Sequence, residues 1–486
     1  MIKPNFAREH ERDYLHRNLV EDNRNYYESN LFQYWIGIRG KGETEEGRVV
    51  NQAIADMFQD VNLIEECVNH YADALFGKSP AFSVAGATNS SIEITETVNQ
   101  EVTDFCNSLW QVSKKLITDD GHDTFYQAQL DVMIDGYAYL RICKEGDRII
   151  IHSPLPGSVT VILRNYFGKP QEIHYTFTET ILNEKGKETE IEYVEVHKLS
   201  PDGMAMITYV DSIGQAIDEE EKPSIVLDLN GELAIQEIRR RPFITPTMKS
   251  AQNALSHAAT MIPRNNDLSN YAKTYVNAKP PGKFVEDEET GDREFELDPN
   301  KIVVAPGIVN FIGGIPIKDE TGMTRGYTNP SVHVDQPIDI SAFVTSANFF
   351  IAIIYTAANL GHLIAKDLIL SGRSRAEMRN DFIVALQKDA ERLSSFLSST
   401  FMTALLINQA MLGKPVDIYK QIVINVKIII NPGKPTPEEQ DEIIKLFQAG
   451  LMSRQTAIAL LGYTDDENAE IQRIESERKN EPPSNS

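Results

Sequence analysis

The N-terminal 135 residues have apolar positions at helical spacing. Between residues 49 and 77, apolar side chains recur at alternating steps of four and three, which places them on one helix face. The members of this stripe are Val50, Ile54, Met57, Val61, Ile64, Val68, Tyr71 and Leu75. Gly77 follows them and is expected to end the helix. We predict that residues 8–135 are mainly helical; the stripe serves either the domain's own core or a subunit contact.

Between residues 136 and 235 the hydrophobic period changes to two. In QEIHYTFT the two faces of the expected strand are Ile173, Tyr175 and Phe177 on one side, and Glu172, His174 and Thr176 on the other. Neighbouring segments alternate in the same way, which predicts a mostly antiparallel sheet with one face exposed to water. The run IDEEEK, residues 217–222, is interpreted as a solvated loop.

Helical spacing returns at residues 247–279, with a kink expected at Pro263. Residues 280–337 are rich in proline and glycine and contain short strand-like runs, which predicts a small β-rich insertion. After this insertion, residues 340–365 contain no Asp, Glu, Lys or Arg. That length could span a bilayer, but polar side chains interrupt it and no basic or aromatic belt flanks it. A helix buried against other protein is the favoured interpretation.

A long helix is predicted from about Arg373 to Leu412. Its apolar face consists of Phe382, Leu386, Ala390, Leu393, Leu397 and Phe401. Forty residues would extend about 60 Å at about 1.5 Å per residue, so this helix is expected to cross between regions of the protein. The alternating segment 421–432 predicts a strand. Capping signals at Thr436, Ser453 and Thr464 then predict three short helices, the first ending at Gly450.

Length and composition predict two or three globular domains. A chain of 486 residues is too long for one ordinary core, and it is 41% hydrophobic and 24% charged. Its net charge of −24 results from 47 Lys and Arg against 71 Asp and Glu. Phosphate neutralisation requires a basic patch, so this chain is not expected to hold nucleic acid by that means. If DNA is involved, the protein must accommodate it without binding it tightly.

The three cysteines are Cys67, Cys106 and Cys143, and each lies among apolar residues. We expect buried free thiols and therefore a reducing compartment, because no CxxC pair or disulfide framework is present. The first fourteen residues are charged throughout and lack the apolar core of a signal peptide.

Sequence signatures of catalysis are absent. The chain contains no GxxxxGK[ST] loop, no HExxH motif and no GxSxG nucleophile turn. The glycines of RGKGETEEGR, residues 39–48, are interpreted as a flexible loop. His10 and His16 are six residues apart and do not share a helix face, so they are not expected to bind a metal. We predict no enzyme activity, no cofactor and no metal site.

Several segments, in their order along the chain, resemble the portal proteins of tailed bacteriophages. The likeness is carried by NYYESN (25–30), FGKSPAFSV (76–84), DGYAYLRIC (135–143), LILSGRSRAEMR (368–379) and AGLMSRQTAIALLG (449–462). The order of helix, β-rich insertion and second helix is similar to that family's stem, clip and stem. The resemblance covers most of the chain. In one departure, Arg373 replaces the small apolar residue that usually follows the SG pair.

The resemblance implies an α+β ring subunit with a helical and β wing, a helical stem, a small β-rich clip, a long wing helix and a helical C-terminal crown. The implied parts are the wing at 1–246, first stem helix at 247–279, clip at 280–337, second stem helix at 338–360, tunnel loop at 361–375, long wing helix and strand at 376–432, crown at 433–479 and a disordered tail at 480–486. By this likeness the tunnel loop faces the DNA channel, with contact residues Gly361, His362, Lys366, Gly372, Arg373, Arg375 and Arg379. For the basic members, solvated charge beside the neighbouring carboxylates Asp367, Glu377 and Asp381 is the favoured interpretation.

The same resemblance implies a function and a set of partners. A dodecameric ring at the capsid vertex of the virion, assembled in the host cytoplasm, would be a channel for packaging and ejecting double-stranded DNA. Its partners would be terminase, head-completion, neck or adaptor proteins, and the major capsid and scaffolding proteins, with no membrane. Twelve chains of −24 would carry −288, which repels phosphate and leaves DNA free to slide. The alternatives are another oligomeric scaffold without a DNA channel, and a membrane-anchored protein that inserts residues 340–365.

Overall fold

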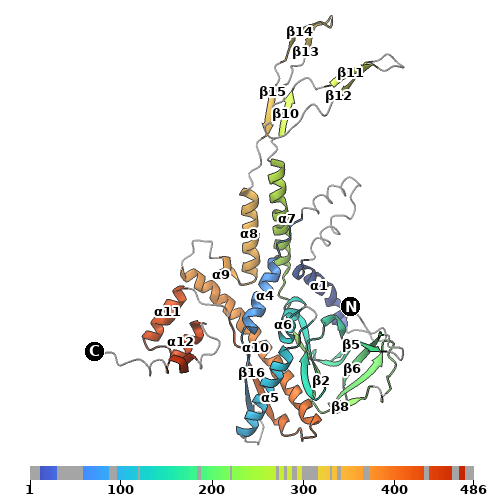
Figure 1. The fold of residues 1–486 in the computed structure, drawn as a ribbon, viewed down its shortest axis with the longest axis vertical. Coiled ribbons are helices and arrows are strands. Elements are labelled where there is room, and N and C mark those ends of the chain that lie inside the picture. The colour runs from blue at the N-terminus through green and yellow to red at the C-terminus, as the bar shows by residue number, and fades with distance from the viewer. Residues whose placement is uncertain are drawn as a thin grey trace, which may run out of the picture. The chain divides into compact units, whose positions relative to one another are not determined.

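The computed structural model describes most of the chain in two compact units (Figure 1). The described residues are 11–29, 58–86, 96–118, 121–182, 188–218, 220, 222–269, 273–277, 282–286, 293–297, 316–328, 331–335, 341–364, 372–431, 437–461, 470–474 and 476. The first unit comprises residues 1–31, 62–250 and 352–486, and the second comprises 32–61 and 251–351. The elements are a mixture of helices and antiparallel strands, so the α+β class is confirmed.

The N-terminal part of the first unit is helical, as predicted, with one strand that the periodicity did not reveal. Its elements are α1 (Glu11–Tyr27), α4 (Leu63–Phe76), β1 (Ala81–Gly86), α5 (Glu96–Lys114) and α6 (Thr124–Ile134). The core contains a stack of aromatic rings, in which Trp110 lies 4.1 Å from Phe125 between nearly parallel planes. Such stacking stabilises the packing beyond the area that it buries.

The long helix predicted over residues 49–77 is shorter than expected. α4 begins at Leu63, because the Asn62 side chain caps it by accepting a hydrogen bond from the Glu65 amide. The Asn62 amide group also donates to the Tyr27 carbonyl, which connects this cap to α1. Val61 therefore precedes the helix and is 36% exposed, whereas Ile64, Val68, Tyr71 and Leu75 are buried. Val50, Ile54 and Met57 lie outside the described residues.

Gly77 ends α4, but not through a left-handed backbone. Its conformation is right-handed, and its amide donates to the Asp73 carbonyl. A Cβ atom here would lie 2.8 Å from that carbonyl oxygen and 3.0 Å from the Asn431 side chain. Glycine is therefore required by close packing, since residue 431 also donates its amide to the Ala74 carbonyl.

The predicted antiparallel region forms two sheets in the first unit. Their strands are β2 (Tyr137–Glu145), β3 (Arg148–His152), β4 (Val159–Arg164), β5 (Pro170–Leu182), β6 (Glu188–Leu199), β7 (Ala205–Asp211), β8 (Ile225–Leu227) and β9 (Ile235–Arg239). One sheet has the order β3-β2-β9 and the other has the order β4-β5-β6-β7-β8. A core of Tyr139 and Ile235 from the first sheet packs against Val159, Val161 and Ile173 from the second.

The prediction of one wet sheet face is wrong for the middle of β5. His174 and Thr176 point away from the Ile173 side, yet they are only 4% and 3% exposed.

The loop at residues 217–222, which was expected to be solvated, also needs correction at its end. Lys222 pairs with Glu179 at 2.6 Å, and its ammonium group lies 4.9 Å from the ring centroid of Tyr193. A cation over an aromatic face is stabilised by the ring's negative potential.

The inner face of the larger sheet also contains a buried ionic cluster. The Glu195 carboxylate binds the Arg141 guanidinium at 2.5 Å and the Nε2 atom of His197 at 2.5 Å. Burial acts to raise the pKa of Glu195, but His197 and Arg141 outweigh it and bring the pKa to about 2. The carboxylate is therefore held in its charged form by two partners from different strands.

The long helix α10 (Gly372–Met411) confirms the prediction from periodicity. All six residues of its expected apolar face are buried. The helix lies wholly within the first unit, so it does not cross between the two units. It packs against β16 (Ile422–Lys427), which alternates buried and exposed residues as predicted and pairs with β1. The Oγ atoms of Ser398 and Ser394 accept the amides of Val426 and Ile428, which satisfies the other edge of this strand.

The two helices after β16 have the expected boundaries. α11 (Pro437–Gln448) is followed by Gly450 with φ of 73°, a left-handed conformation that glycine adopts without steric cost. α12 (Arg454–Leu461) is capped by Ser453, whose Oγ accepts the Thr456 amide at 3.1 Å. Thr436 and Thr464 lie outside the described residues.

The second unit contains most of α7 (Pro246–Ser269), the β-rich insertion and the first part of α8 (Ser341–Ala357). Pro263 lies inside α7, and the helix ends earlier than predicted. The insertion consists of β10 (Lys273–Asn277), β11 (Gly282–Glu286), β12 (Arg293–Leu297), β13 (Pro316–Lys318), β14 (Thr324–Tyr327) and β15 (Ser331–Asp335). β10 falls in the segment predicted as helix, and its pairing with β15 joins the two ends of the insertion.

Residues 58–61 run beside α7 within the second unit. Polar side chains one turn apart on α7 hold them: Gln252 donates to the Val61 carbonyl, Ser256 donates to Asp60 at 3.0 Å, and Thr260 accepts from the Gln59 amide at 3.0 Å. These contacts hold the segment before α4, which is not helical, against α7. None of the helices in the described part of the chain has the length and hydropathy needed to cross a bilayer.

Candidate functional site

The uncharged helix α8 ends in a closed turn. The Leu360 amide donates to the Tyr355 carbonyl at 2.7 Å, and the Asn359 amide donates to the Thr356 carbonyl at 3.1 Å. Asn359 has φ of 57°, a left-handed conformation that asparagine tolerates better than most residues. This pair of bonds is the Schellman arrangement, and Leu360 is fully buried beside it. The short helix α9 (Gly361–Ile364) follows directly.

Tyr71 of α4 anchors this turn. Its hydroxyl donates to the Ala358 carbonyl at 2.9 Å, and its ring lies 4.7 Å from Phe243 and 5.0 Å from Phe382. Burial raises the pKa of Tyr71 to about 12, so the hydroxyl remains a donor at any physiological pH. The turn after α8 is thereby joined to α4, to the segment after β9 and to α10.

The structure changes the limits of the predicted tunnel loop, residues 361–375. Gly361 and His362 belong to α9, and the His362 ring lies 5.3 Å from the Phe382 ring. Gly372 is the first residue of α10, so Arg373 and Arg375 lie in its first turn. The segment between the helices is 365–371; it includes Lys366 and lies outside the described residues.

Arg379 was expected to contact DNA from a position near the tunnel loop. It belongs to α10 and is only 8% exposed, so in this chain it is not an accessible cation for passing DNA. Helical spacing explains the difference, because Arg379 is three residues before Phe382 on the same helix and falls near its buried face. The site predicted from sequence is thus divided among α9, the undescribed segment and the start of α10.

All three cysteines were predicted to be buried, and the structure confirms this for Cys67 and Cys106. Burial raises the pKa of Cys67 and of Cys106 to about 12, which keeps both groups protonated and weakly nucleophilic at neutral pH. Cys143 is only half-buried. Within the described ranges, no group of three or more His, Cys, Asp or Glu side chains is arranged to bind a metal ion.

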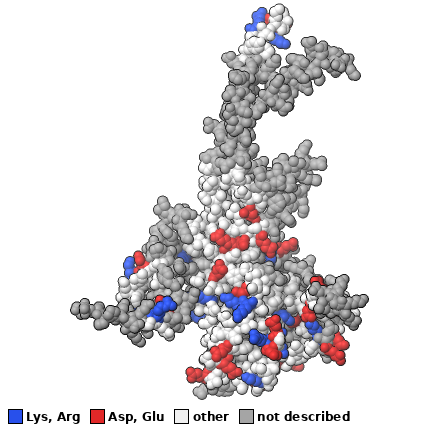
Figure 2. Space-filling view, viewed as in Figure 1, with Lys and Arg blue, Asp and Glu red and all other residues white. Residues whose placement is uncertain are grey.

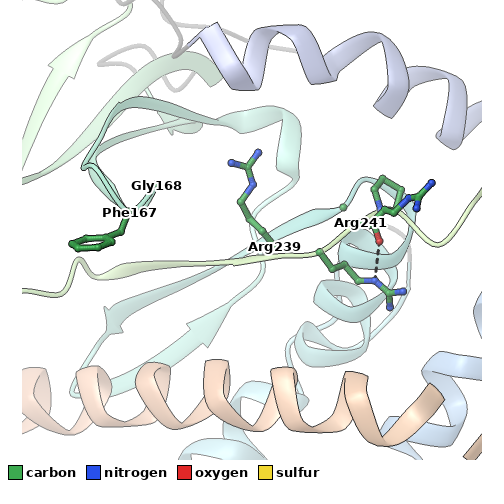
Figure 3. Close-up of a pocket in the computed structure, with 7 residues that line it drawn as sticks. Phe167, Gly168, Arg239 and Arg241 are labelled. Atoms are coloured by element: carbon green, nitrogen blue, oxygen red, sulfur yellow. Dashed lines mark hydrogen bonds between the residues drawn. The ribbon is translucent and has the colours of Figure 1, made fainter. Parts of the chain in front are cut away.

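A second candidate site, which the sequence analysis did not single out, is a cavity of about 490 Å³ in the first unit (Figure 3). It is lined by Gly136, Phe167, Gly168, Arg239, Arg240, Arg241 and Pro242. The aromatic side comes from the turn between β4 and β5; Arg239 is the last residue of β9, and Arg240 and Arg241 follow it. The signal was visible in the sequence: three consecutive arginines are unusual in a chain whose net charge is −24.

Close backbone packing holds the arginine segment in place. The Arg240 amide donates to the Gly136 carbonyl at 2.8 Å, and the Arg240 Nε donates to the Arg241 carbonyl at 3.0 Å. Gly136 has φ of 85°, and a Cβ atom there would lie 2.9 Å from both the Arg240 carbonyl oxygen and Pro242. Only glycine allows the segment to approach so closely.

Comparisons with solved structures find weak likenesses, among them two chains from the necks of GTA particles. A chain in the neck of an empty GTA particle, computed with C6 symmetry, is 14% identical with a TM-score of 0.34. A chain in the neck of a native GTA particle, computed with C12 symmetry, is 14% identical with a TM-score of 0.35. Each likeness covers 82% of this chain and 89% of the other. TM-scores this low do not establish a shared fold. No protein-family model matches the chain, and no curated protein matches its sequence.

Proposed function

We propose that this chain is a subunit of a phage-like connector ring, and specifically a portal protein that forms a channel for double-stranded DNA at a capsid vertex. The observation that carries the proposal is α8. This helix of 17 residues contains no charged side chain, yet Val344 and Phe349 are 45% and 61% exposed. Figure 2 shows the corresponding uncharged surface in white. Exposed apolar side chains on a helix without charge favour contact with a partner.

A second copy of this chain is the partner that best fits this helix. None of the described helices can cross a bilayer, so insertion into a membrane is not supported as the way to cover α8. The order of α7, a strand-rich insertion, α8, a short corner and the long helix α10 also agrees with the order that the sequence resemblance implies. Neighbouring copies in a ring would cover the apolar surface of one another's α8.

In this proposal the ring catalyses no reaction of its own. The channel repels DNA phosphate through its acidic charge, and packaging energy comes from a separate terminase motor. Head-completion, neck or adaptor proteins, scaffolding protein and the major capsid protein bind its outer surfaces. The division into wing, stem, clip and crown, and the dodecameric count, remain predictions within this proposal.

Electron microscopy of the purified chain tests the proposal directly. Rings with an open axis are expected, with a mass near 655 kDa for twelve chains of 54.6 kDa. The rings alone should neither hydrolyse ATP nor cut DNA. A monomer or dimer at micromolar concentration, with no rings in the images, contradicts the proposal; a compact low-order assembly favours a scaffold without a channel.

A further inference from the structure

The turn beside the arginine cavity presents two aromatic side chains to solvent. Tyr166 and Phe167 are 97% and 90% exposed, and their rings meet edge to face at 5.5 Å. The turn itself is well held: the Asn165 Oδ1 accepts the amides of Phe167 and Lys169, at 3.0 and 2.9 Å. Because the backbone is already ordered, a partner that covers these rings loses little conformational entropy on binding.

The same turn is tied to the arginine side of the cavity. Arg164 donates to the Gly168 carbonyl at 2.8 Å and binds both oxygens of Glu237 on β9, each at 2.7 Å. Gly168 has φ of 82°, so the turn closes through a left-handed residue. The two aromatic residues of the turn and the arginine segment therefore form one connected surface. We call it the arginine–aromatic patch; it consists of Tyr166, Phe167, Arg239, Arg240 and Arg241.

Positive charge exceeds negative charge among the described groups at this patch. Glu237 is bound by Arg164, with the Arg239 Nε at 3.9 Å, and Asp389 is shared between Arg240 at 2.7 Å and Arg392 at 2.9 Å. These pairs join four arginines to two carboxylates. Arg241 is exposed and has no ion-pair partner in the part of the chain that the structure describes. In Figure 3 its side chain extends from the segment that lines the cavity.

We propose that the arginine–aromatic patch is a contact surface for a second copy of this chain and receives a carboxylate-bearing part of that copy. Arginine and aromatic residues are enriched at the centres of protein interfaces. Each copy supplies an excess of 24 negative charges, so copies repel one another unless the sign is reversed locally where they meet. Guanidinium groups bind carboxylates through paired hydrogen bonds, which also fixes orientation.

The patch further indicates how the copies meet. In a two-fold dimer a patch on the axis would face its own equivalent, and arginine would oppose arginine. In a ring each subunit's patch meets a different surface of its neighbour, so a positive patch can face a negative one. The inference therefore rests on the proposed ring and assigns this patch to its head-to-tail contact.

A photo-crosslinking amino acid at position 167 tests this contact in assembled full-length protein. The matched control is position 213: Ile213 is 63% exposed on another turn in which an aspartate, Asp211, accepts the amides of residues 213 and 215. Irradiation is expected to give a covalent dimer from position 167 and none from position 213. Mass spectrometry should locate the crosslink in a peptide that contains Asp or Glu. No dimer from rings labelled at 167, or a crosslink only to copurified nucleic acid, overturns the inference.

Charge reversal at Arg241 supplies an independent readout. Arg241→Glu is expected to raise the concentration for half-assembly by about tenfold or more. Arg148→Glu, which changes an exposed arginine at the start of β3, should change that concentration by less than about twofold. Unchanged circular dichroism of both variants would show that each still folds. Rings that assemble equally well with Arg241→Glu overturn this inference alone. Failure of the unsubstituted chain to form rings in any condition overturns the proposed function.

Discussion

The hydroxyl of Tyr71 on α4 donates a hydrogen bond of 2.9 Å to the backbone carbonyl of Ala358, 287 residues later in the chain. This bond holds the turn that ends α8 against the core of the first unit. The turn is where the uncharged helix gives way to α9 and then to the segment that enters α10. The positions of α8, α9 and the start of α10 thus depend on one buried donor, so loss of this hydrogen bond should lower the stability of the site.

Replacing Tyr71 with phenylalanine is expected to lower the free energy of unfolding by about 1–3 kcal/mol, because the buried Ala358 carbonyl loses its donor while the ring packing remains. Urea denaturation monitored by circular dichroism measures this change. Tyr126→Phe is the control, since its hydroxyl bonds the exposed Asp73 carboxylate and should be worth less. Equal effects of the two substitutions would contradict the anchoring role of Tyr71.

Glu195→Gln should destabilise the first unit by about 3–5 kcal/mol at pH 7, because the Arg141 guanidinium loses the charge that compensates its burial and His197 loses its carboxylate partner. The control is Glu232→Gln, whose partner Lys169 is partly exposed at 44% and whose pair should contribute about 1 kcal/mol or less. The folded-state pKa of Glu195, about 2, lies below its ordinary value of 4.5. Its contribution is therefore complete above about pH 4.5 and is lost as the pH falls toward 2, which acid denaturation of the two variants can compare.

Asp135 should make the free energy of unfolding depend on pH in the opposite direction to Glu195. Burial raises its pKa from 3.8 to about 7, although Arg24 partly offsets that rise. The folded state then binds a proton that the unfolded state releases, so stability falls as the pH rises from about 4 to 7, by at most about 1.4 kcal/mol per pH unit. Asp135→Asn should remove this slope. Denaturant titrations at pH 5, 6, 7 and 8 check it, and parallel curves for the two proteins would sink the prediction.

Phe349→Asp is expected to raise the concentration for half-assembly by at least about tenfold, because it places a charge on the exposed apolar surface of α8. Light scattering across a dilution series measures assembly. Leu451→Asp introduces the same charge at another exposed apolar residue, between α11 and α12, and should leave assembly unchanged. If both variants form rings as readily as the unsubstituted chain, α8 is not the contact helix.

Shortening the chain within residues 365–371 should leave the ring intact and abolish DNA packaging or retention. The deletion leaves both α9 and α10 complete, and the proposed ring contacts lie elsewhere. Neutralising Lys366, Arg373 and Arg375 together should have a milder effect, since transient contacts with phosphate are screened by salt. The measurement is the DNA content of heads built on microscopy-verified rings. Normal packaging would exclude a channel role for this segment, and loss of the rings would show that it is structural.

Several elements were predictable because their signals are local. The six apolar positions of α10 from Phe382 to Phe401 repeat at helical spacing and are all buried. β16 alternates buried and exposed residues as its sequence indicates, and Ser453 and Gly450 mark helix boundaries through interactions with their own neighbours. In each case the signal that indicates the element lies within a short stretch of the chain.

Other features depended on partners distant in sequence. The apolar stripe before Leu63 does not continue as helix through residues 58–61, because Gln252, Ser256 and Thr260 of α7 bind that segment through hydrogen bonds. His174 and Thr176 are on the polar face of a strand yet are buried. Arg379 was expected to be an accessible cation near the tunnel loop, but the register of α10 buries it.

The sequence by itself determined the helix and strand periods, the capping residues, the acidic charge and the absence of catalytic motifs, since each follows from composition or from neighbours within about one helical turn. Tertiary structure alone decided where Tyr71 meets Ala358, how Arg141 and Glu195 pair between strands, and that the arginines after β9 share a cavity with Phe167. These outcomes depend on which distant surfaces pack together. That choice is made by the burial of whole faces rather than by any local signal in the chain.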